Sequence, residues 1–137
     1  MAQYPTTTYP SGRTIQYNLG TGMHDLTGIL NGNGWTAASI TAHAGGTRAA
    51  ATPITTQQTL IAVCATTADS CMLPPAMGGQ TLLVTNGGAA SSQLFANAAG
   101  SDTINGVAAG TGIALAAGKS MMLFSPLQGA WFGVLSA

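Results

Sequence analysis

Short stretches of alternating or continuous apolar residues, each followed by turn-forming residues, make up most of the second half of the chain. The clearest is Gln80–Thr85, which is rich in apolar and β-branched residues and therefore predicts a strand. Asn86-Gly87-Gly88 suits a turn, because Asn and Gly adopt positive φ at little cost. Ser92–Asn97 then predicts the returning strand of a β-hairpin, and Asn105-Gly106 predicts a second tight turn.

The same alternation of short strand and turn extends over the rest of this region. Further strands are expected at residues 38–43, 56–65, 71–73, 113–115, 119–125 and 130–135. Turn residues recur about every 8 to 12 positions and no segment has a convincing helical period, which is typical of a β-sandwich or jelly roll. We therefore predict an all-β chain, with a β-sandwich or jelly-roll-like domain over residues 37–137.

Alternation within these strands divides their apolar residues between two faces. One set is expected to form the core of the sandwich: Leu60, Val63, Leu73, Leu82, Val84, Leu94, Ile104, Leu115, Leu123, Trp131 and Val134. Their neighbours Ile61, Leu83 and Met122 are expected to face outward and to line an interface between subunits.

Residues 1–36 differ from this region and predict an extended N-terminal arm. Two Tyr-Pro steps favour an extended backbone, and frequent glycines interrupt the apolar residues that follow. The segment cannot build its own core, which leaves a disordered tail or an arm that lies on a partner. Its aromatic and aliphatic residues favour the arm, because disordered tails are depleted in them. The residues expected to bind the partner are Tyr4, Tyr9, Arg13, Tyr17, Leu26 and Trp35.

Charge is scarce in this chain. Asp, Glu, Lys and Arg make up 4% of the 137 residues and the formal net charge is zero, whereas these residues make up about 25% of an ordinary soluble domain. Such a surface lacks the repulsion that keeps proteins apart, so we expect partner chains or its many uncharged polar residues to keep it soluble. Three basic residues cannot neutralise a run of phosphates, so no nucleic-acid partner is expected.

No stretch of the sequence suggests a membrane segment or a secretory signal. The longest apolar runs fall short of the roughly 18 residues that a membrane helix needs. The N-terminus shows neither the basic region nor the apolar stretch of a signal peptide. We therefore expect synthesis in the cytosol and no membrane partner.

The side chains that catalysis or metal binding requires are few and scattered. Asp69 and Asp102 lie in turn contexts, where each is expected to cap its own turn. The spacing of Cys64 and Cys71 permits a disulfide between paired strands, but a protein made in the cytosol favours two reduced, buried thiols. We expect no enzymatic activity, no cofactor and no metal; a pocket joining His43 to either aspartate would revive an enzymatic interpretation.

From residue 40 onward, a series of motifs follows a recognisable order. The series runs from an Asp turn leading to Leu-Pro (Asp69 to Pro74), through a Gly-initiated strand ending in Asn (Gly79 to Asn86), the segment Asp102-Thr103-Ile104-Asn105-Gly106 and the segment Leu115-Ala116-Ala117-Gly118-Lys119-Ser120, to a strand with Trp131. In these motifs the chain resembles the capsid decoration, or cement, proteins of tailed phages, and related β-domains of phage tails and fibres.

The resemblance implies a non-enzymatic, oligomeric, all-β protein of the virion. We expect a decoration protein on the outer surface of a phage head that clamps subunits of the major capsid protein. A homo-oligomer is expected, with a trimer favoured over a dimer. The alternative is a tail-fibre or receptor-binding β-domain, which would gather aromatic side chains near a concave polar face.

Overall fold

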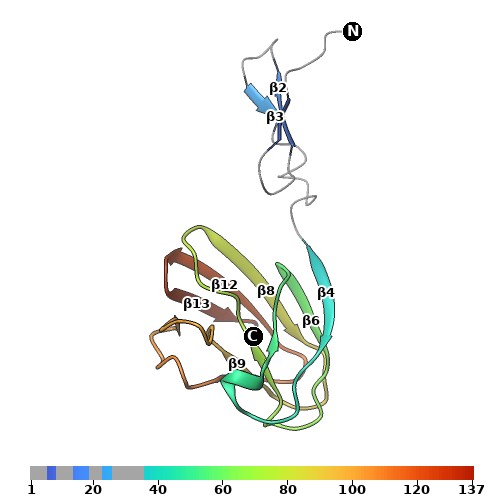
Figure 1. Ribbon diagram of the computed structural model, residues 1–137. Helices are drawn as coiled ribbons and strands as arrows, with labels where there is room; N and C mark the ends of the chain where they lie inside the picture. Colours follow the sequence, from blue (N-terminus) through green and yellow to red (C-terminus); the bar gives the residue numbers. More distant parts are fainter. Residues whose placement is uncertain (1–5, 9–13, 19–22, 26–35) are drawn as a thin grey trace. The chain divides into compact units, whose positions relative to one another are not determined.

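The computed structural model describes residues 36–137 and, before them, three short strands (Figure 1). The chain divides into two compact units, Met1–Trp35 and Thr36–Ala137. In the first unit, β1 (Thr6–Thr8), β2 (Thr14–Asn18) and β3 (Met23–Asp25) form an antiparallel sheet in the order β1-β2-β3.

The second unit contains two β-sheets. The larger, six-stranded sheet consists in order of β10 (Thr103–Ile104), β13 (Ala130–Leu135), β12 (Ser120–Leu127), β8 (Gln80–Asn86), β6 (Gln58–Val63) and β4 (Ala37–Thr41). The smaller, four-stranded sheet consists in order of β11 (Ile113–Leu115), β9 (Ser92–Phe95), β7 (Ser70–Met72) and β5 (Thr52–Pro53). A short 3-10 helix, η2 (Arg48–Ala50), precedes β5. The all-β prediction is therefore confirmed.

Successive strands from β4 to β9 enter the two sheets alternately. In the larger sheet β4, β6 and β8 are parallel neighbours, and in the smaller sheet β5, β7 and β9 are parallel neighbours. Each pair of consecutive strands thus makes one coil, as in a β-solenoid. The last strands reverse this direction, because β12 is antiparallel to both β8 and β13, and β11 is antiparallel to β9.

The predicted hairpin of β8 and β9 is wrong, because these strands lie in different sheets. After β8, the N–H of Gly87 donates to the carbonyl of Ile61, so the chain stays against β6 before it crosses. The Asn86 side chain holds this crossing: its Nδ2 donates to the carbonyl oxygens of Ala90 and Leu115, each at 2.8 Å. These contacts direct the chain to the four-stranded sheet.

The glycines of the two predicted turns serve different purposes. Asn105 and Gly106 have φ of 52° and 73°, so the predicted tight turn is confirmed. Asn86, Gly87 and Gly88 do not have positive φ, contrary to the prediction. Gly88 is required for space, because a Cβ there would lie 2.5 Å from the Cβ of Cys64.

The apolar core contains residues from both sheets. Eight predicted core residues are buried, namely Leu73, Leu82, Val84, Leu94, Ile104, Leu115, Leu123 and Trp131. Three predictions were wrong: Leu60, Val63 and Val134 are 43%, 51% and 63% exposed.

Strand register explains these errors. In β6 the side chains of Thr59 and Ile61 are buried, so Leu60 points outward and Ile61, expected at an interface, is core. Val63 follows a register shift between β4 and β6 that interrupts the alternation. In β13 Trp131 points inward, so Val134, three positions later, points outward.

Candidate functional site: the outer face of the six-stranded sheet

Exposed apolar side chains gather on one face of the six-stranded sheet, the face turned away from the core, which we call the outer face. Met122 of β12 lies opposite Leu83 of β8 on one side and Val134 of β13 on the other. Phe124 lies opposite Phe132, and their rings stack with centroids 6.0 Å apart. Exposures of 54% for Met122, 43% for Phe124 and 41% for Phe132 leave these side chains accessible.

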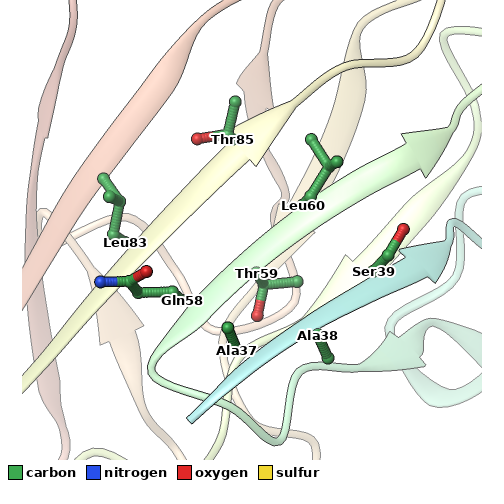
Figure 2. A pocket seen from close by; sticks show the side chains of 8 residues that line it. All are labelled: Ala37, Ala38, Ser39, Gln58, Thr59, Leu60, Leu83 and Thr85. Atoms are coloured by element: carbon green, nitrogen blue, oxygen red, sulfur yellow. The ribbon is translucent and has the colours of Figure 1, made fainter. Parts of the chain in front are cut away.

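The outer face continues into a shallow groove over β4, β6 and β8. Figure 2 shows Ser39, Leu60 and Thr85 projecting from the same side of three adjacent strands. They lie in one row, because Ser39 is opposite Leu60 and Leu60 is opposite Thr85 in the register of the sheet. The groove has a volume of about 500 Å³. It is lined by Ala37, Ala38, Ser39, Gln58, Thr59, Leu60, Leu83 and Thr85.

The outer face carries no charge on the strands that form it. The second unit has four charged residues. In the sequence, all of them fall in the segments that connect those strands: Arg48, Asp69, Asp102 and Lys119. Alanine, serine, threonine and glutamine surround the apolar side chains instead. A contiguous exposed apolar patch rimmed by polar residues marks an interaction surface. An uncharged patch of this kind suits a neutral protein surface better than an ionic ligand.

Asp69 holds the connection between β6 and β7. Its Oδ2 accepts hydrogen bonds from the backbone N–H groups of Ala65 at 2.7 Å and Thr66 at 3.1 Å. Its Oδ1 accepts from the Thr66 hydroxyl at 2.6 Å. These bonds, led by that of the hydroxyl, hold the pKa of Asp69 below its ordinary value. The predicted capping role is confirmed.

Asp102 links two loops and does not cap its own turn, contrary to the prediction. Its Oδ2 accepts a hydrogen bond from the backbone N–H of Ala76 at 2.7 Å, across 26 residues of sequence. Arg48 also bridges distant loops, since its guanidinium donates to the carbonyl oxygens of Asn97 at 3.4 Å and Ala109 at 3.0 Å. Both charged groups therefore hold loops of the solenoid-like body together.

Cys64 and Cys71 are buried free thiols. The prediction of two reduced, buried cysteines, and not of a disulfide, is therefore confirmed. Burial raises the pKa of Cys71 to about 11 and also raises that of Cys64. Thiols that stay protonated at neutral pH are poor nucleophiles and poor metal ligands. Structure and electrostatics thus assign both cysteines to packing.

The described residues contain no group of His, Cys, Asp and Glu side chains arranged to hold a metal ion. His43 is exposed and pairs through its backbone with Ser70, by hydrogen bonds of 2.9 and 2.8 Å. Asp69 accepts its three bonds from Ala65 and Thr66, and no hydrogen bond joins it to His43. Within the part of the chain that the structure describes, no helix has the length and apolarity to cross a membrane.

The predicted partner-binding residues belong to the first unit. Tyr17 lies in β2, where its backbone pairs with His24 of β3. The others lie outside the described residues: Tyr4, Tyr9, Arg13, Leu26 and Trp35. These predictions stay untested by the geometry.

No match to this chain was found among protein-family models, curated proteins or solved structures. The properties of the outer face must therefore be interpreted from its own residues.

The sequence reasoning placed Leu83 and Met122 on outward-facing positions but did not identify the other exposed apolar residues of the outer face. Phe124, Phe132 and Leu60 were the main omissions. A usable signal was present, because Met122 and Phe124 are two positions apart on one strand and therefore share a face. Their exposure to the same side becomes clear only when the order of strands is known.

Proposed function

We propose that this protein is a non-enzymatic structural protein of a phage virion, which decorates the outer surface of the head and clamps subunits of the major capsid protein. The observation that carries the proposal is the uncharged apolar outer face of the six-stranded sheet. Met122, Phe124, Phe132 and Val134 offer contact area there that gains free energy only when another surface covers it. The motif resemblance to tailed-phage decoration proteins supports a phage capsid as that surface.

The proposed mechanism is stabilisation by selective binding. A protein that binds assembled capsid subunits, and not free ones, shifts the shell away from disassembly by mass action. A rigid β body with a preformed contact face suits this task, since little conformational entropy is lost on docking. The N-terminal residues Tyr4, Tyr9, Arg13, Tyr17, Leu26 and Trp35 are proposed as a second contact with the capsid or a neighbouring subunit.

A finer classification of the fold belongs to the same proposal. Two sheets packed around one core support a sandwich related to jelly-roll virion domains, whereas the parallel coils of β4 to β9 are solenoid-like. The proposed attachment depends on the exposed face and is independent of which description is used.

A carbohydrate-binding tail-fibre domain is less well supported. Sugar sites commonly combine an aromatic platform with polar groups in a depression. The groove over β4, β6 and β8 is lined by aliphatic and small polar residues, without an aromatic side chain. The two stacked phenylalanines lie on β12 and β13 instead.

The test is attachment to undecorated heads of the phage that encodes the protein. Met122→Asp places a charge at the centre of the outer face, and cosedimentation with the heads should fall at least tenfold. Met77→Asp is the matched control, because Met77 is 59% exposed, similar to Met122 at 54%, but lies in a loop. Normal binding by Met122→Asp, with circular dichroism showing that both variants fold, would exclude the outer face as the attachment surface. Failure of the unmodified protein to bind heads would exclude decoration itself.

A further inference from the structure

The strand β4 lies at an edge of the six-stranded sheet and uses one side of its backbone to pair with β6. The carbonyl of Thr36 accepts a hydrogen bond from the N–H of Gln58, and the N–H of Ala42 donates to the carbonyl of Val63, each at 2.9 Å. Backbone groups of successive residues in a strand point to opposite sides. The backbone N–H and C=O groups of the even-numbered residues from Thr36 to Ala42 therefore point toward β6.

The backbone N–H and C=O groups of the odd-numbered residues of β4 point away from β6, toward the open edge. The position of Thr41 supports this orientation, because its carbonyl accepts a hydrogen bond from the Thr52 hydroxyl at 2.8 Å, outside the pairing with β6. Among the described residues, nothing pairs with the N–H and C=O groups of Ala37 and Ser39. The edge thus offers a row of backbone donors and acceptors, spaced as another strand requires.

The opposite edge of the same sheet is protected. There β10 covers only Ala130 and Trp131 of β13. Beyond it, the Asn105 side chain takes over the pairing: Nδ2 donates to the carbonyl of Gly133 at 3.2 Å, and Oδ1 accepts from the Gly133 N–H at 2.8 Å. An amide side chain that satisfies both groups of an edge residue blocks the addition of a strand there.

The edges of the four-stranded sheet are also short. Pro53 makes up half of β5 and has no N–H to donate. At the other edge, the carbonyl of Leu115 in β11 accepts a hydrogen bond from Asn86. In contrast, β4 has five residues, with no proline and no charged residue. Among the described residues, β4 is thus the edge with the longest run of free backbone groups, and only the Thr41 carbonyl near its end is engaged, by the Thr52 hydroxyl.

We infer that β4 pairs antiparallel with β4 of a second copy of this chain, across a two-fold axis at Ser39. The register is self-complementary, because Ala37 and Thr41, which both face the open edge, are equally distant from Ser39 in sequence. Ser39 would exchange two hydrogen bonds with Ser39 of the second copy. Ala37 would lie opposite Thr41 on each side, where the Thr41 carbonyl accepts a second hydrogen bond beside that of the Thr52 hydroxyl. A two-fold interface needs one surface on each molecule, and the neutral Ala, Ser and Thr side chains of β4 oppose it neither by charge nor by bulk.

This pairing has a consequence for attachment, which rests on the proposed function. A two-fold axis between antiparallel strands of one sheet is perpendicular to that sheet, so both outer faces lie on the same side. The dimer would bind a shell through two apolar faces, and the second contact forms at a high effective concentration. The geometry of β4 thus favours a dimer, whereas a trimer was expected for a decoration protein.

The experiment uses charge at the axis. In an antiparallel pair, hydrogen-bonded residues face each other with Cα atoms about 5.5 Å apart, so like charges at position 39 repel and opposite charges attract. Ser39→Lys and Ser39→Glu are each expected to be monomers of 13.6 kDa at low salt, and the unmodified chain to have twice that mass. An equimolar mixture of the two variants should regain the dimer mass in sedimentation velocity.

Two further variants complete the experiment. Gln58→Lys places the same charge on the outer face of β6, one strand away, and should remain a dimer. Ser39→Pro removes the outward N–H without breaking a bond to β6, and should be a folded monomer by circular dichroism. The inference is overturned if the unmodified chain is a monomer or a trimer at about 100 μM, or if Ser39→Lys remains a dimer. Because no phage heads are present, these results are independent of attachment, and Met122→Asp should lose attachment while remaining a dimer.

Discussion

The indole Nε1 of Trp131 donates a hydrogen bond to the carbonyl oxygen of Pro74 at 3.1 Å. Trp131 is fully buried in β13, and Pro74 lies in the loop that follows β7, so the bond joins the two sheets through a side chain. A buried indole N–H without a partner is costly, and the loop carbonyl removes this cost. The last strand of the chain, β13, is therefore held to the smaller sheet by the packing of Trp131 and by its hydrogen bond to Pro74.

Substitution of Trp131 should separate these two contributions. Trp131→Phe retains most of the buried ring but loses the hydrogen bond, and should lower the free energy of unfolding by about 1–3 kcal/mol. Trp131→Ala also opens a cavity and should cost about 3–5 kcal/mol. Denaturant unfolding followed by circular dichroism measures both. Equal losses for the two variants would contradict a separate role for the indole N–H.

The assignment of core and outer face in the larger sheet can be tested with one leucine on each. Leu82→Ala should lower the free energy of unfolding by roughly 2–5 kcal/mol, because the side chain is 5% exposed and packs in the core. Leu60→Ala is the matched control on the outer face and should cost less than about 1 kcal/mol. A larger loss for Leu60→Ala than for Leu82→Ala would show that the register of β6 is wrong.

Stability should fall in acid partly through Asp69. Its pKa is lowered in the folded protein, so the carboxylate contributes stability above its ordinary pKa of 3.8, and this contribution is lost as the pH falls through the folded value. Asp69→Asn cannot titrate and should show a shallower decline of unfolding free energy below about pH 4. Unfolding measured from pH 7 to pH 2.5 provides the comparison. Parallel curves for the two proteins would remove Asp69 from the explanation.

The two thiols should be unreactive while the protein is folded. Burial raises the pKa of Cys71 to about 11, so almost no thiolate is present at pH 8, and Cys64 is shifted in the same direction. Ellman's reagent at pH 8 should react with neither residue in the native protein and with both after addition of guanidinium chloride. Rapid reaction of either thiol in the native protein would place it at an accessible site.

The proposed attachment to phage heads should depend little on salt. The strands of the outer face carry no charged residue, so screening of ion pairs between low salt and about 1 M has little to weaken. Cosedimentation at several concentrations of sodium chloride is the measurement. Release at high salt from heads that remain intact would instead indicate an ionic contact outside the outer face.

The class of fold and most of the core were predictable from the sequence, because both depend on local alternation. Leu82 and Val84 are two positions apart in β8 and therefore share a face, and both are buried as predicted. In β6 the sequence does not show which residues point inward, because Leu60 and Ile61 are adjacent and either one could belong to the buried face.

The order of strands was not predictable in the same way. A hairpin and a crossover between sheets can begin with the same turn residues. The choice at Asn86 is made by its side chain, which reaches the carbonyl of Leu115 across 29 positions. The two phenylalanines of the outer face were missed for this reason, since Phe124 and Phe132 become neighbours only once β12 and β13 are paired.

The place of β8 in the sheet has a consequence for synthesis. One side of β8 is covered by β6, which precedes it, and the other by β12, which ends about 40 residues later. At roughly 5–20 residues per second, a ribosome would need about 2–8 s to make the chain from the end of β8 to the end of β12. During that interval β8 is an open edge of the growing sheet. The backbone N–H and C=O groups on the β12 side of β8 stay unpaired until β12 is made, so this edge is open to pairing with another chain at this stage.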